Sequence, residues 1–573
     1  MRPHYWMLGA IMAGGMILRA INLGVPDIAG DDALYSLRSI GWVDYVASTN
    51  LQSTPISWFD TPQWWQGLSF HDAPPLVFAV QRIFFAVGGD TIIAARLPFV
   101  VAGTALIGAV FLLTSAVAGM YAGLAAAGAL AIMSYAVGAS RIGLLDGFAA
   151  LWTACVLYFF IKAGTRPKYY LWWGLAMGLG MLTKYTFIFL VPVFCIGFLL
   201  WRYRDFRRKW VWLGVGILFA MLMPLIVYNA MMWQERGHPD AALATMIGQH
   251  PADFQGLVRE THALRDAPRA AVKIFADNFS IGFRLLFLWG ILAAILYIRR
   301  AKDAVVLQNL ILLGLAFVSG MAVVSLAGGS DRFGVILAPL VAVVLGIGMS
   351  EAWGYAHRWR AWAVAGVIGI AMLGESIFAV QSQLLVNLPL PFPMFVARNR
   401  PVFTGYRFLE DYVAGFYREF PEPSPIVIFK DEPQLAALQK QWIEARLRGV
   451  AKPVFQKHLL VFDDRISWFA WVWIFERRRL YDSAPIHSIG QFLEKVDAGG
   501  RTFYTQLGLG DATVIVADDD LLEREGAQSS DIYASFTREL AVAGKPIYEI
   551  RAYDGRTLFR VFRLPLAVAG QRL

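Results

Sequence analysis

The chain has 573 residues, of which 57% are hydrophobic and 16% charged, a balance too apolar for an ordinary soluble protein. Its formal net charge is +9, but the basic residues concentrate in short loops between apolar runs, which is typical of membrane proteins and argues against nucleic-acid binding. The two cysteines, Cys155 and Cys195, lie in apolar runs, so the composition predicts a polytopic membrane protein without a disulfide scaffold.

The first apolar run, YWMLGAIMAGGMILRAINLGV, is predicted to be a retained span, because it carries Arg19 and no small-residue cleavage pattern follows it. Runs of about 20 residues, long enough to cross about 30 Å of hydrocarbon, recur as far as about residue 380. We expect about eleven transmembrane helices, near residues 5–24, 92–115, 121–140, 147–163, 170–183, 186–201, 211–230, 281–298, 304–326, 333–350 and 361–380.

The long segment 25–91 contains two aromatic, amphipathic pieces, WFDTPQWWQGLSF and APPLVFAVQRIFFAV, which are predicted to be helices in the membrane interface. The second piece is also compatible with a true span. That alternative would invert every later loop unless another span were lost, and it would turn the basic clusters outward. We therefore favour the interfacial interpretation.

The basic loop clusters predict the orientation of the chain, because such clusters lie on the cytoplasmic side. With an odd number of spans, the segments 25–91 and 231–280 and the whole chain after about residue 385 are expected to lie outside the cytoplasm. The sequence thus predicts a membrane module over 1–390, with the large outer loop 25–91, and a soluble extracytoplasmic domain over 391–573.

The domain over 391–573 alternates β-rich and helical patterns, which predicts one α/β domain. Its β-rich runs include a hairpin signal, since Asp554-Gly555 can supply the positive φ angles of a tight turn. The run WFAWVWIF, 468–475, is too short to span and is either a core strand, which we favour, or a surface that dips into lipid. The β-rich runs are PIVIF, KHLLVFDD, DATVIVADDD and KPIYEIRAYDGRTLFRVF.

Ionisable residues collect at the outer ends of the predicted spans, where charge at membrane depth is costly. Their convergence indicates a shared polar cavity, although each side chain alone could snorkel to the interface or form a structural pair. They are Asp31, Asp32, His71, Asp72, Arg96, Arg141, Asp146, Lys184, Asp331 and Arg332.

Asp31 and Asp32 are neighbours in sequence and therefore point in different directions, so one is expected to react and the other to support it. A buried carboxylate can act as general base toward a hydroxyl, and a like charge beside it raises its pKa toward the working range. The alternative is that these residues cap the helix predicted by DDALYSLRSI. Capping and catalysis are compatible.

Lys184 and Arg141 are the cations best suited to an anionic headgroup, because a phosphate near the bilayer needs donors in place of lost water. Asp146 is expected either to orient Arg141 or to assist a substrate. The sequence has no Cys/His metal spacing, phosphate loop or nucleotide fingerprint, so a nucleotide-sugar donor is unsupported.

At these residues the chain resembles the lipid-linked sugar transferases of the GT-C fold, the group of protein O-mannosyltransferases and aminoarabinose lipid A transferases (glycosyltransferase families 39 and 83). The resemblance covers roughly residues 10–350 and rests on an ordered set of motifs. These are GDDALYS, FHDAPPLVFAVQRIFFAVGGDTIIAARLPFVVAG, SRIGLLDGFAALW, GLAMGLGMLTKYTFIFLVP and SDRFGVILAPL.

The resemblance implies that Asp31 stands at the catalytic acidic position, Asp32 at the acidic residue beside it and Asp146 at the second acidic position. It also implies that Lys184 and Arg332 are the basic residues of the site. The chain departs from its relatives in FHDAPPL, where Ala73 replaces a common Lys or His. We therefore expect His71 or Arg96 to supply the phosphate contact that this residue makes in the relatives.

The expected reaction is inverting transfer of a sugar from a polyprenyl-phosphate carrier to a hydroxyl of a lipid, glycan or protein acceptor, with Asp31 as general base. The donor phosphate would rest on Lys184, Arg141 and Arg332. No cofactor is expected to be required, while a divalent metal on Asp31 and Asp32 stays open. The alternative is a non-enzymatic lipid or glycan flippase or envelope assembly factor.

Overall fold

The computed structural model describes most of the chain and divides it into two compact units. The helical unit comprises Met1–Gly24, Asn50–Gln52 and Trp64–Pro401, and the sheet unit comprises Val25–Thr49, Ser53–Gln63 and Val402–Leu573. The described residues are 3–28, 30–45, 55–59, 61–254, 267–300, 303–326, 331–355, 358–386, 388, 390–398, 400, 403–419, 433–447, 458–500, 502–527 and 531–566.

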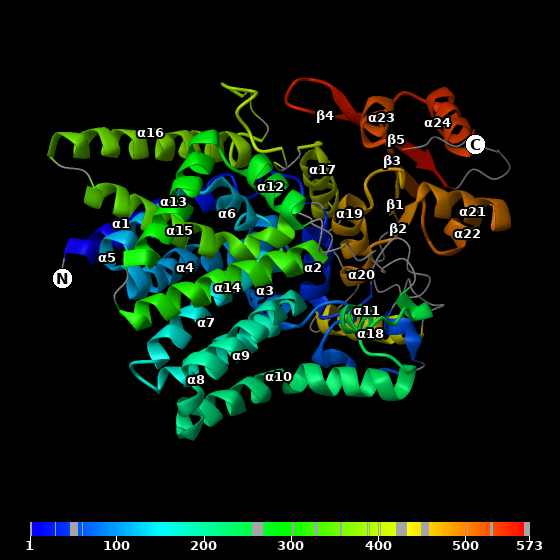
Figure 1. Cartoon of the computed structure of the whole chain (residues 1–573). Helices are drawn as coiled ribbons and strands as arrows, with labels where there is room; N and C mark the ends of the chain where they lie inside the picture. Colours follow the sequence, from blue (N-terminus) through cyan, green and yellow to red (C-terminus); the bar gives the residue numbers. More distant parts are fainter. Residues whose placement is uncertain are drawn as a thin grey trace. The chain divides into compact units, whose positions relative to one another are not determined.

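The helical unit has a helical segment at each position where the sequence predicts a span (Figure 1). Its α-helices are α1 (Pro3–Ala20), α3 (Leu76–Gly88), α4 (Ile92–Ala118), α5 (Met120–Ile132), α6 (Ser134–Ala139), α7 (Leu145–Ala163), α8 (Tyr169–Met181), α9 (Leu190–Trp201), α10 (Lys209–Arg236), α11 (Ala241–Met246), α12 (Ala267–Asn278), α13 (Ile281–Arg300), α14 (Ala304–Leu326), α15 (Ala338–Tyr355) and α16 (Arg358–Gln383). Two 3₁₀ segments, η3 (Tyr185–Phe189) and η7 (Asp331–Leu337), precede α9 and α15.

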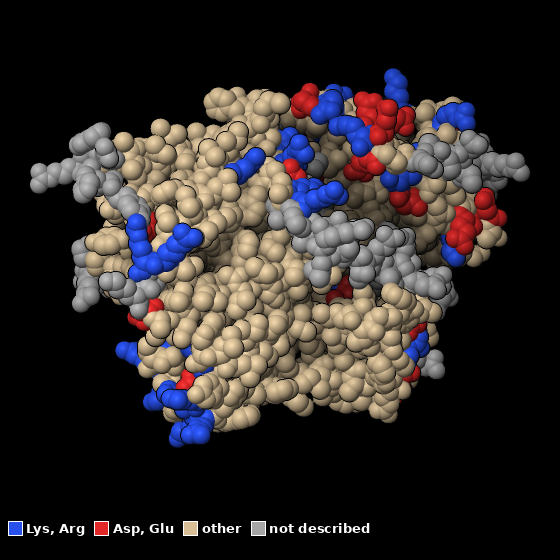
Figure 2. Space-filling view, in the orientation of Figure 1, with Lys and Arg blue, Asp and Glu red and all other residues tan. Residues whose placement is uncertain are grey.

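Among the described residues, 7 helices are long and apolar enough to cross a membrane, and three shorter apolar helices accompany them. On the face shown in Figure 2, the helical unit presents a wide uncharged surface with charged residues near its edges. Lipid-facing helices have such a surface, since charge is costly in hydrocarbon. The protein is therefore a polytopic membrane protein, and the predicted number of about eleven spans stays a prediction.

The two interfacial pieces of the predicted outer loop have different structures. APPLVFAVQRIFFAV contains α3, whose 13 residues extend about 20 Å and cannot cross about 30 Å of hydrocarbon alone. The helix predicted in WFDTPQWWQGLSF is wrong for its described residues, which contain only short 3₁₀ turns. Pro62 and Gly67 interrupt the helical pattern there.

The sheet unit contains the predicted C-terminal α/β fold, with a 5-stranded sheet in the order β2-β1-β3-β5-β4. Strands β2 and β3 pair parallel with β1, and β5 pairs antiparallel with β3 and β4. The predicted hairpin is confirmed, because Gly555 has a φ of 84° in the turn between β4 and β5. The strands are β1 (His458–Phe462), β2 (Ile486–Ser488), β3 (Asp511–Ala517), β4 (Tyr548–Arg551) and β5 (Thr557–Pro565).

The sheet unit also contains α2, which belongs to the predicted outer loop, and the helices that follow residue 405. The predicted run PIVIF lies outside the described residues. The helices are α2 (Asp31–Gly41), α17 (Tyr406–Glu419), α18 (Pro433–Leu447), α19 (Trp468–Trp471), α20 (Arg477–Tyr481), α21 (Ile489–Gly499), α22 (Thr502–Gln506), α23 (Asp519–Glu525) and α24 (Asp531–Ala543).

The strand favoured for WFAWVWIF is wrong, because this run forms α19 and the π-helical segment η8 (Val472–Glu476). The expectation of a core position is right, since Val472, Trp473 and Phe475 are buried. A short run that is apolar on every side has neither helical nor strand periodicity, so its burial is readable and its conformation is not.

Candidate functional site

Two predicted site residues of the helical unit, Asp146 and Lys184, form an ion pair. Asp146 lies in the first turn of α7, where the helix dipole favours a carboxylate. Lys184 has extended backbone angles in the break between α8 and η3, and its Nζ donates to Asp146 Oδ1 at 2.6 Å. Both side chains are largely buried, at 15% and 4% exposure, so this charge-assisted bond holds the ammonium group in place.

Arg332 joins this pair through the ring of Phe333. Lys184 Nζ lies 4.3 Å from the ring centroid, and the guanidinium carbon of Arg332 lies 4.9 Å from it. The negative face of an aromatic ring attracts a cation at such a distance. We call Asp146, Lys184, Arg332 and Phe333 the Lys184 cluster, which gathers two cations and one carboxylate.

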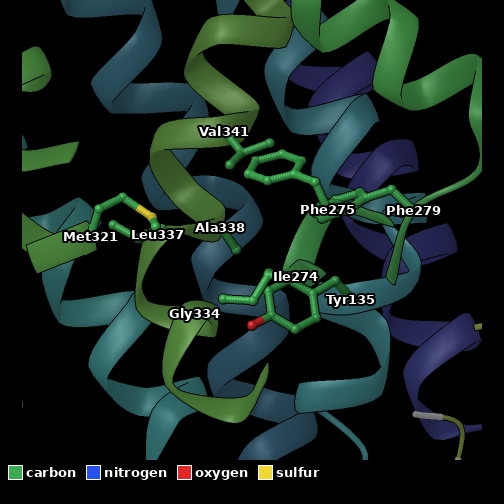
Figure 3. A pocket seen from close by; sticks show the side chains of 9 residues that line it. All are labelled: Tyr135, Ile274, Phe275, Phe279, Met321, Gly334, Leu337, Ala338 and Val341. Atoms are coloured by element: carbon green, nitrogen blue, oxygen red, sulfur yellow. The ribbon is translucent and has the colours of Figure 1, made fainter. Parts of the chain in front are cut away.

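The segment η7, which carries Arg332 and Phe333, also borders a small apolar cavity inside the helical unit. The side chains in Figure 3 come from α6, α12 and the turn after it, α14, η7 and α15, and the hydroxyl of Tyr135 is the only labelled side-chain oxygen there. The lining residues are Tyr135, Ile274, Phe275, Phe279, Met321, Gly334, Leu337, Ala338 and Val341.

Sequence reasoning missed a polar network that begins at the residue after Lys184. The Tyr185 hydroxyl donates to Oδ2 of the fully buried Asp240. Asp240 Oδ1 accepts from the Leu243 N–H at 2.9 Å, and the Asp240 N–H donates to Asn229 Oδ1 at 2.8 Å. Burial raises the pKa of the Asp240 carboxyl, against these hydrogen bonds. The position of Asp240 before AALATM is a helix-cap signal that the sequence shows, whereas no sequence signal indicates its bond to Tyr185.

His71 lies in a neighbouring aromatic cluster of the same unit. Its ring stacks on Phe254 at 6.0 Å, its Nδ1 lies 4.0 Å from Asp72 Oδ1, and its carbonyl accepts from Ala241 N–H at 2.7 Å. His238 packs against the same Phe254 ring at 4.9 Å. The phosphate contact predicted for His71 stays a prediction.

Arg141 and Arg96 are directed toward backbone carbonyls at and after the C-terminal end of α1. The terminal nitrogens of Arg141 donate to the carbonyls of residues 18, 19, 21 and 22, and Arg96 donates to the carbonyl of Leu23 at 3.0 Å. Cations near a helix C-terminus interact favourably with its exposed carbonyls. This geometry favours a structural role for both arginines. One of the two roles expected of Asp146 was to orient Arg141, but its hydrogen bond is with Lys184.

Asp31 and Asp32 lie in the sheet unit, in the first turn of α2. The cap position expected of them is instead occupied by Gly30, whose φ is 65°, and no side chain caps this end. Asp32 is fully buried, and Asp31 Oδ2 accepts from the Tyr35 hydroxyl at 3.3 Å. The two carboxylates therefore have different surroundings, as their adjacency in sequence predicts.

Within the described part of the chain, no group of three or more His, Cys, Asp or Glu residues could hold a metal ion. A cation bound by the pair Asp31 and Asp32 therefore stays a prediction.

Comparison with known proteins gives a family match over the part of the chain that contains the Asp146–Lys184 pair. The dolichyl-phosphate-mannose-protein mannosyltransferase family model matches residues 72–228, a range that contains Asp146 and Lys184. No curated protein sequence matches the chain.

Two solved structures share its architecture. ArnT from Cupriavidus metallidurans bound to undecaprenyl phosphate is similar over 100% of both chains, at 14% identity and a TM-score of 0.53. The Archaeoglobus fulgidus oligosaccharyltransferase in complex with Zn and sulfate is similar over 98% of this chain and 75% of its own, at 15% identity and a TM-score of 0.51. The chain therefore has the GT-C fold of lipid-linked sugar transferases, as its motifs predict.

Proposed function

We propose that the protein is a membrane glycosyltransferase that moves a sugar from a polyprenyl-phosphate carrier to an acceptor hydroxyl. The family match and the GT-C fold support this class of transferase. The Lys184 cluster carries the proposal, because two cations lie against one aromatic ring in a membrane unit and one of them is paired with a carboxylate. Such a site suits the phosphate of a lipid-linked donor.

In the proposed reaction, Asp31 removes the proton of the acceptor hydroxyl while its oxygen attacks the anomeric carbon. The bond between that carbon and the phosphate oxygen breaks in the same displacement, so the configuration inverts and polyprenyl phosphate leaves. Lys184 and Arg332 stabilise the charge that develops on the leaving phosphate. Asp146 holds Lys184, and Asp32 supports Asp31 or a cation.

This proposal departs from the sequence-based prediction at Arg141 and Arg96, whose guanidinium groups serve backbone carbonyls. The reaction needs no cofactor, because the cationic side chains can neutralise a monophosphate. We place it on the extracytoplasmic side from the distribution of basic loops. The sugar is a hexose or pentose, and the acceptor is a lipid, glycan or protein hydroxyl.

The direct test of donor binding uses undecaprenyl phosphate as the probe and the purified full chain in detergent. We expect Lys184→Ala to weaken binding. Lys162→Ala is the control and should leave binding unchanged, because Lys162 lies in the last turn of α7, at the opposite end from Asp146. Equal affinity of the wild type and Lys184→Ala would remove the Lys184 cluster from the proposal. A flippase would move lipid-linked sugar without releasing polyprenyl phosphate, which mass spectrometry distinguishes.

A further inference from the structure

The helix that carries the proposed base is held within the sheet unit by a tyrosine near its C-terminal end. The Tyr481 hydroxyl donates to the carbonyl of Leu37, in the second half of α2, at 2.6 Å. Tyr481 is buried and is the last residue of α20. It supplies α2 with a donor from more than 400 residues later in the chain, at a separation of 444.

The same ring lies against the last residue of α2. A Cβ atom added to Gly41 would lie 2.1 Å from Cε1 of Tyr481, so a side chain at this position would displace either the ring or the helix. Only glycine permits the contact as it stands. The following residue, Trp42, ends α2 in the left-handed region with a φ of 57°.

An apolar cluster holds the same face of α2 and the segment after it. It joins residues that precede position 63 to residues of α18, η8 and α20, all within the sheet unit. Burial of this cluster stabilises α2 against the C-terminal part of the chain. Its members are Leu37, Val43, Ile56, Leu435, Val472, Leu480 and Tyr481.

The chain just before α2 is held by Asp27. Its carboxylate accepts from the backbone N–H groups of Thr404, Gly405 and Arg407 at 2.6, 3.0 and 2.7 Å. These groups stand at the N-terminal end of α17, whose dipole favours a negative charge. Burial raises the pKa of the Asp27 carboxyl, and these hydrogen bonds oppose the shift. Contacts from the C-terminal part of the chain therefore hold α2 on both sides of Asp31 and Asp32.

We infer that the C-terminal part of the chain positions the acidic helix for the reaction, with Asp27 and Tyr481 as positioning residues. The inference rests on the proposed function and gives the C-terminal domain a catalytic role in addition to its own fold. Catalytic groups must be held within about 0.5 Å of their working geometry, and a displacement of about 1 Å can cost about 10²-fold in rate.

The test variant is Tyr481→Phe, which keeps the ring and removes the hydrogen bond to Leu37. Its matched control is Tyr504→Phe in the same unit. Tyr504 is also buried, and its hydroxyl lies 2.9 Å from His487 Nδ1, but it belongs to a different apolar cluster. The two variants lose comparable interactions, and only the first contacts α2.

Two readouts are needed on the full chain at neutral pH. The first is hydrogen exchange of the α2 amides, which should be about five-fold faster in Tyr481→Phe and unchanged in Tyr504→Phe. The second is turnover of lipid-linked sugars extracted from the source cells, followed as released polyprenyl phosphate. We expect kcat to fall about ten-fold in Tyr481→Phe with an unchanged Kd for undecaprenyl phosphate. Gly41→Ala should lower kcat by about 10²-fold, because the added Cβ meets the Tyr481 ring.

Unchanged α2 exchange in Tyr481→Phe would overturn the inference, as would a loss of turnover matched by Tyr504→Phe or accompanied by an equal loss of undecaprenyl phosphate affinity. Failure of the proposed function gives a different result, in which the wild type itself releases no polyprenyl phosphate. That result would also remove the catalytic meaning of the positioning contacts.

Discussion

The helical unit and the sheet unit satisfy the hydrogen-bond donors of their buried arginines in different ways. In the helical unit, Arg19 donates to the carbonyls of Gly15, Leu130 and Ala131, and Arg141 donates to carbonyls at the end of α1. In the sheet unit, Arg477 and Arg478 both bond to Glu410 at 2.9 Å, and Arg465 bonds to Asp463 at 2.6 Å.

The difference lies in the acceptor groups that surround each guanidinium. Helix ends present carbonyl groups with partial negative charge, so a helical membrane unit can satisfy a guanidinium without using a carboxylate. Asp146 is then left to hold Lys184. In the sheet unit, Glu410 and Asp463 are committed to arginines. The proposal gives donor binding to the first unit and proton removal to the second.

The largest effect is expected from Asp31→Asn, which keeps the size of the side chain and abolishes its basicity. Transfer should fall by about 10² to 10⁴-fold while undecaprenyl phosphate binding stays normal, because the change affects only acid–base catalysis. Asp32→Asn should cost less. If a cation bridges the pair, both changes and chelation should have the same large effect.

The assay is transfer by purified protein in detergent, with thermal unfolding as the folding control. Near-normal turnover by well-folded Asp31→Asn protein would remove Asp31 from the mechanism.

The next effect concerns stability and should appear only in the sheet unit. Glu410→Gln leaves two buried guanidinium groups without their shared carboxylate, and the expected cost is about 3–5 kcal/mol. The matched control is Glu549→Gln, which breaks the exposed pair with Arg551 and should barely change stability, because water screens such a pair. Hydrogen exchange should localise the loss to residues after 402. Equal effects of the two changes would contradict the distinction.

We expect His487 in the sheet unit to make the free energy of unfolding change by about 3 kcal/mol with pH. Burial, with Arg479 and Lys495 nearby, lowers the pKa of His487 to about 4, against about 6.5 in the unfolded chain. The neutral ring is favoured in the fold, so stability should be full above about pH 6.5 and fall as the pH drops from 6.5 toward 4. Denaturant unfolding of His487→Gln should show a flatter profile. An unchanged profile would assign the acid sensitivity to other groups.

The smallest effect is expected from Lys184→Ala in the helical unit. Loss of one charged phosphate contact should weaken donor binding by about 10 to 100-fold, and the dependence on acceptor should not change. Initial rates over a grid of donor and acceptor concentrations separate the two. A changed acceptor dependence at constant donor affinity would place Lys184 on the acceptor side.

Local patterns predict much of the fold. The apolar runs locate the helices, and Asp554-Gly555 locates the hairpin turn. The conformation of WFAWVWIF was not predictable, because a short run without periodicity fits a strand or a buried helix equally well. The place of α2 in the sheet unit has no local signal either, since Asp27 bonds to residues 377 to 380 positions away.

The sequence predicted which residues belong to the candidate site, but only some of the contacts between them. Family-like motifs identified Asp146, Lys184 and Arg332, which the structure brings together. Arg141 was assigned to phosphate because a sequence does not show which backbone carbonyls end near a guanidinium. The network of Tyr185 and Asp240 was missed for the same reason, since the two residues are 55 positions apart.

The most direct test of the central claim is the release of polyprenyl phosphate by the purified protein. Lipid-linked sugars extracted from the source cells are incubated with the wild type or with Asp31→Asn in the presence of envelope acceptors, and the lipids are followed by mass spectrometry. We predict that the wild type consumes one polyprenyl-phosphate sugar and releases the matching polyprenyl phosphate, whereas Asp31→Asn releases at least about a hundred-fold less. A wild-type protein that consumes no lipid-linked sugar would contradict the account.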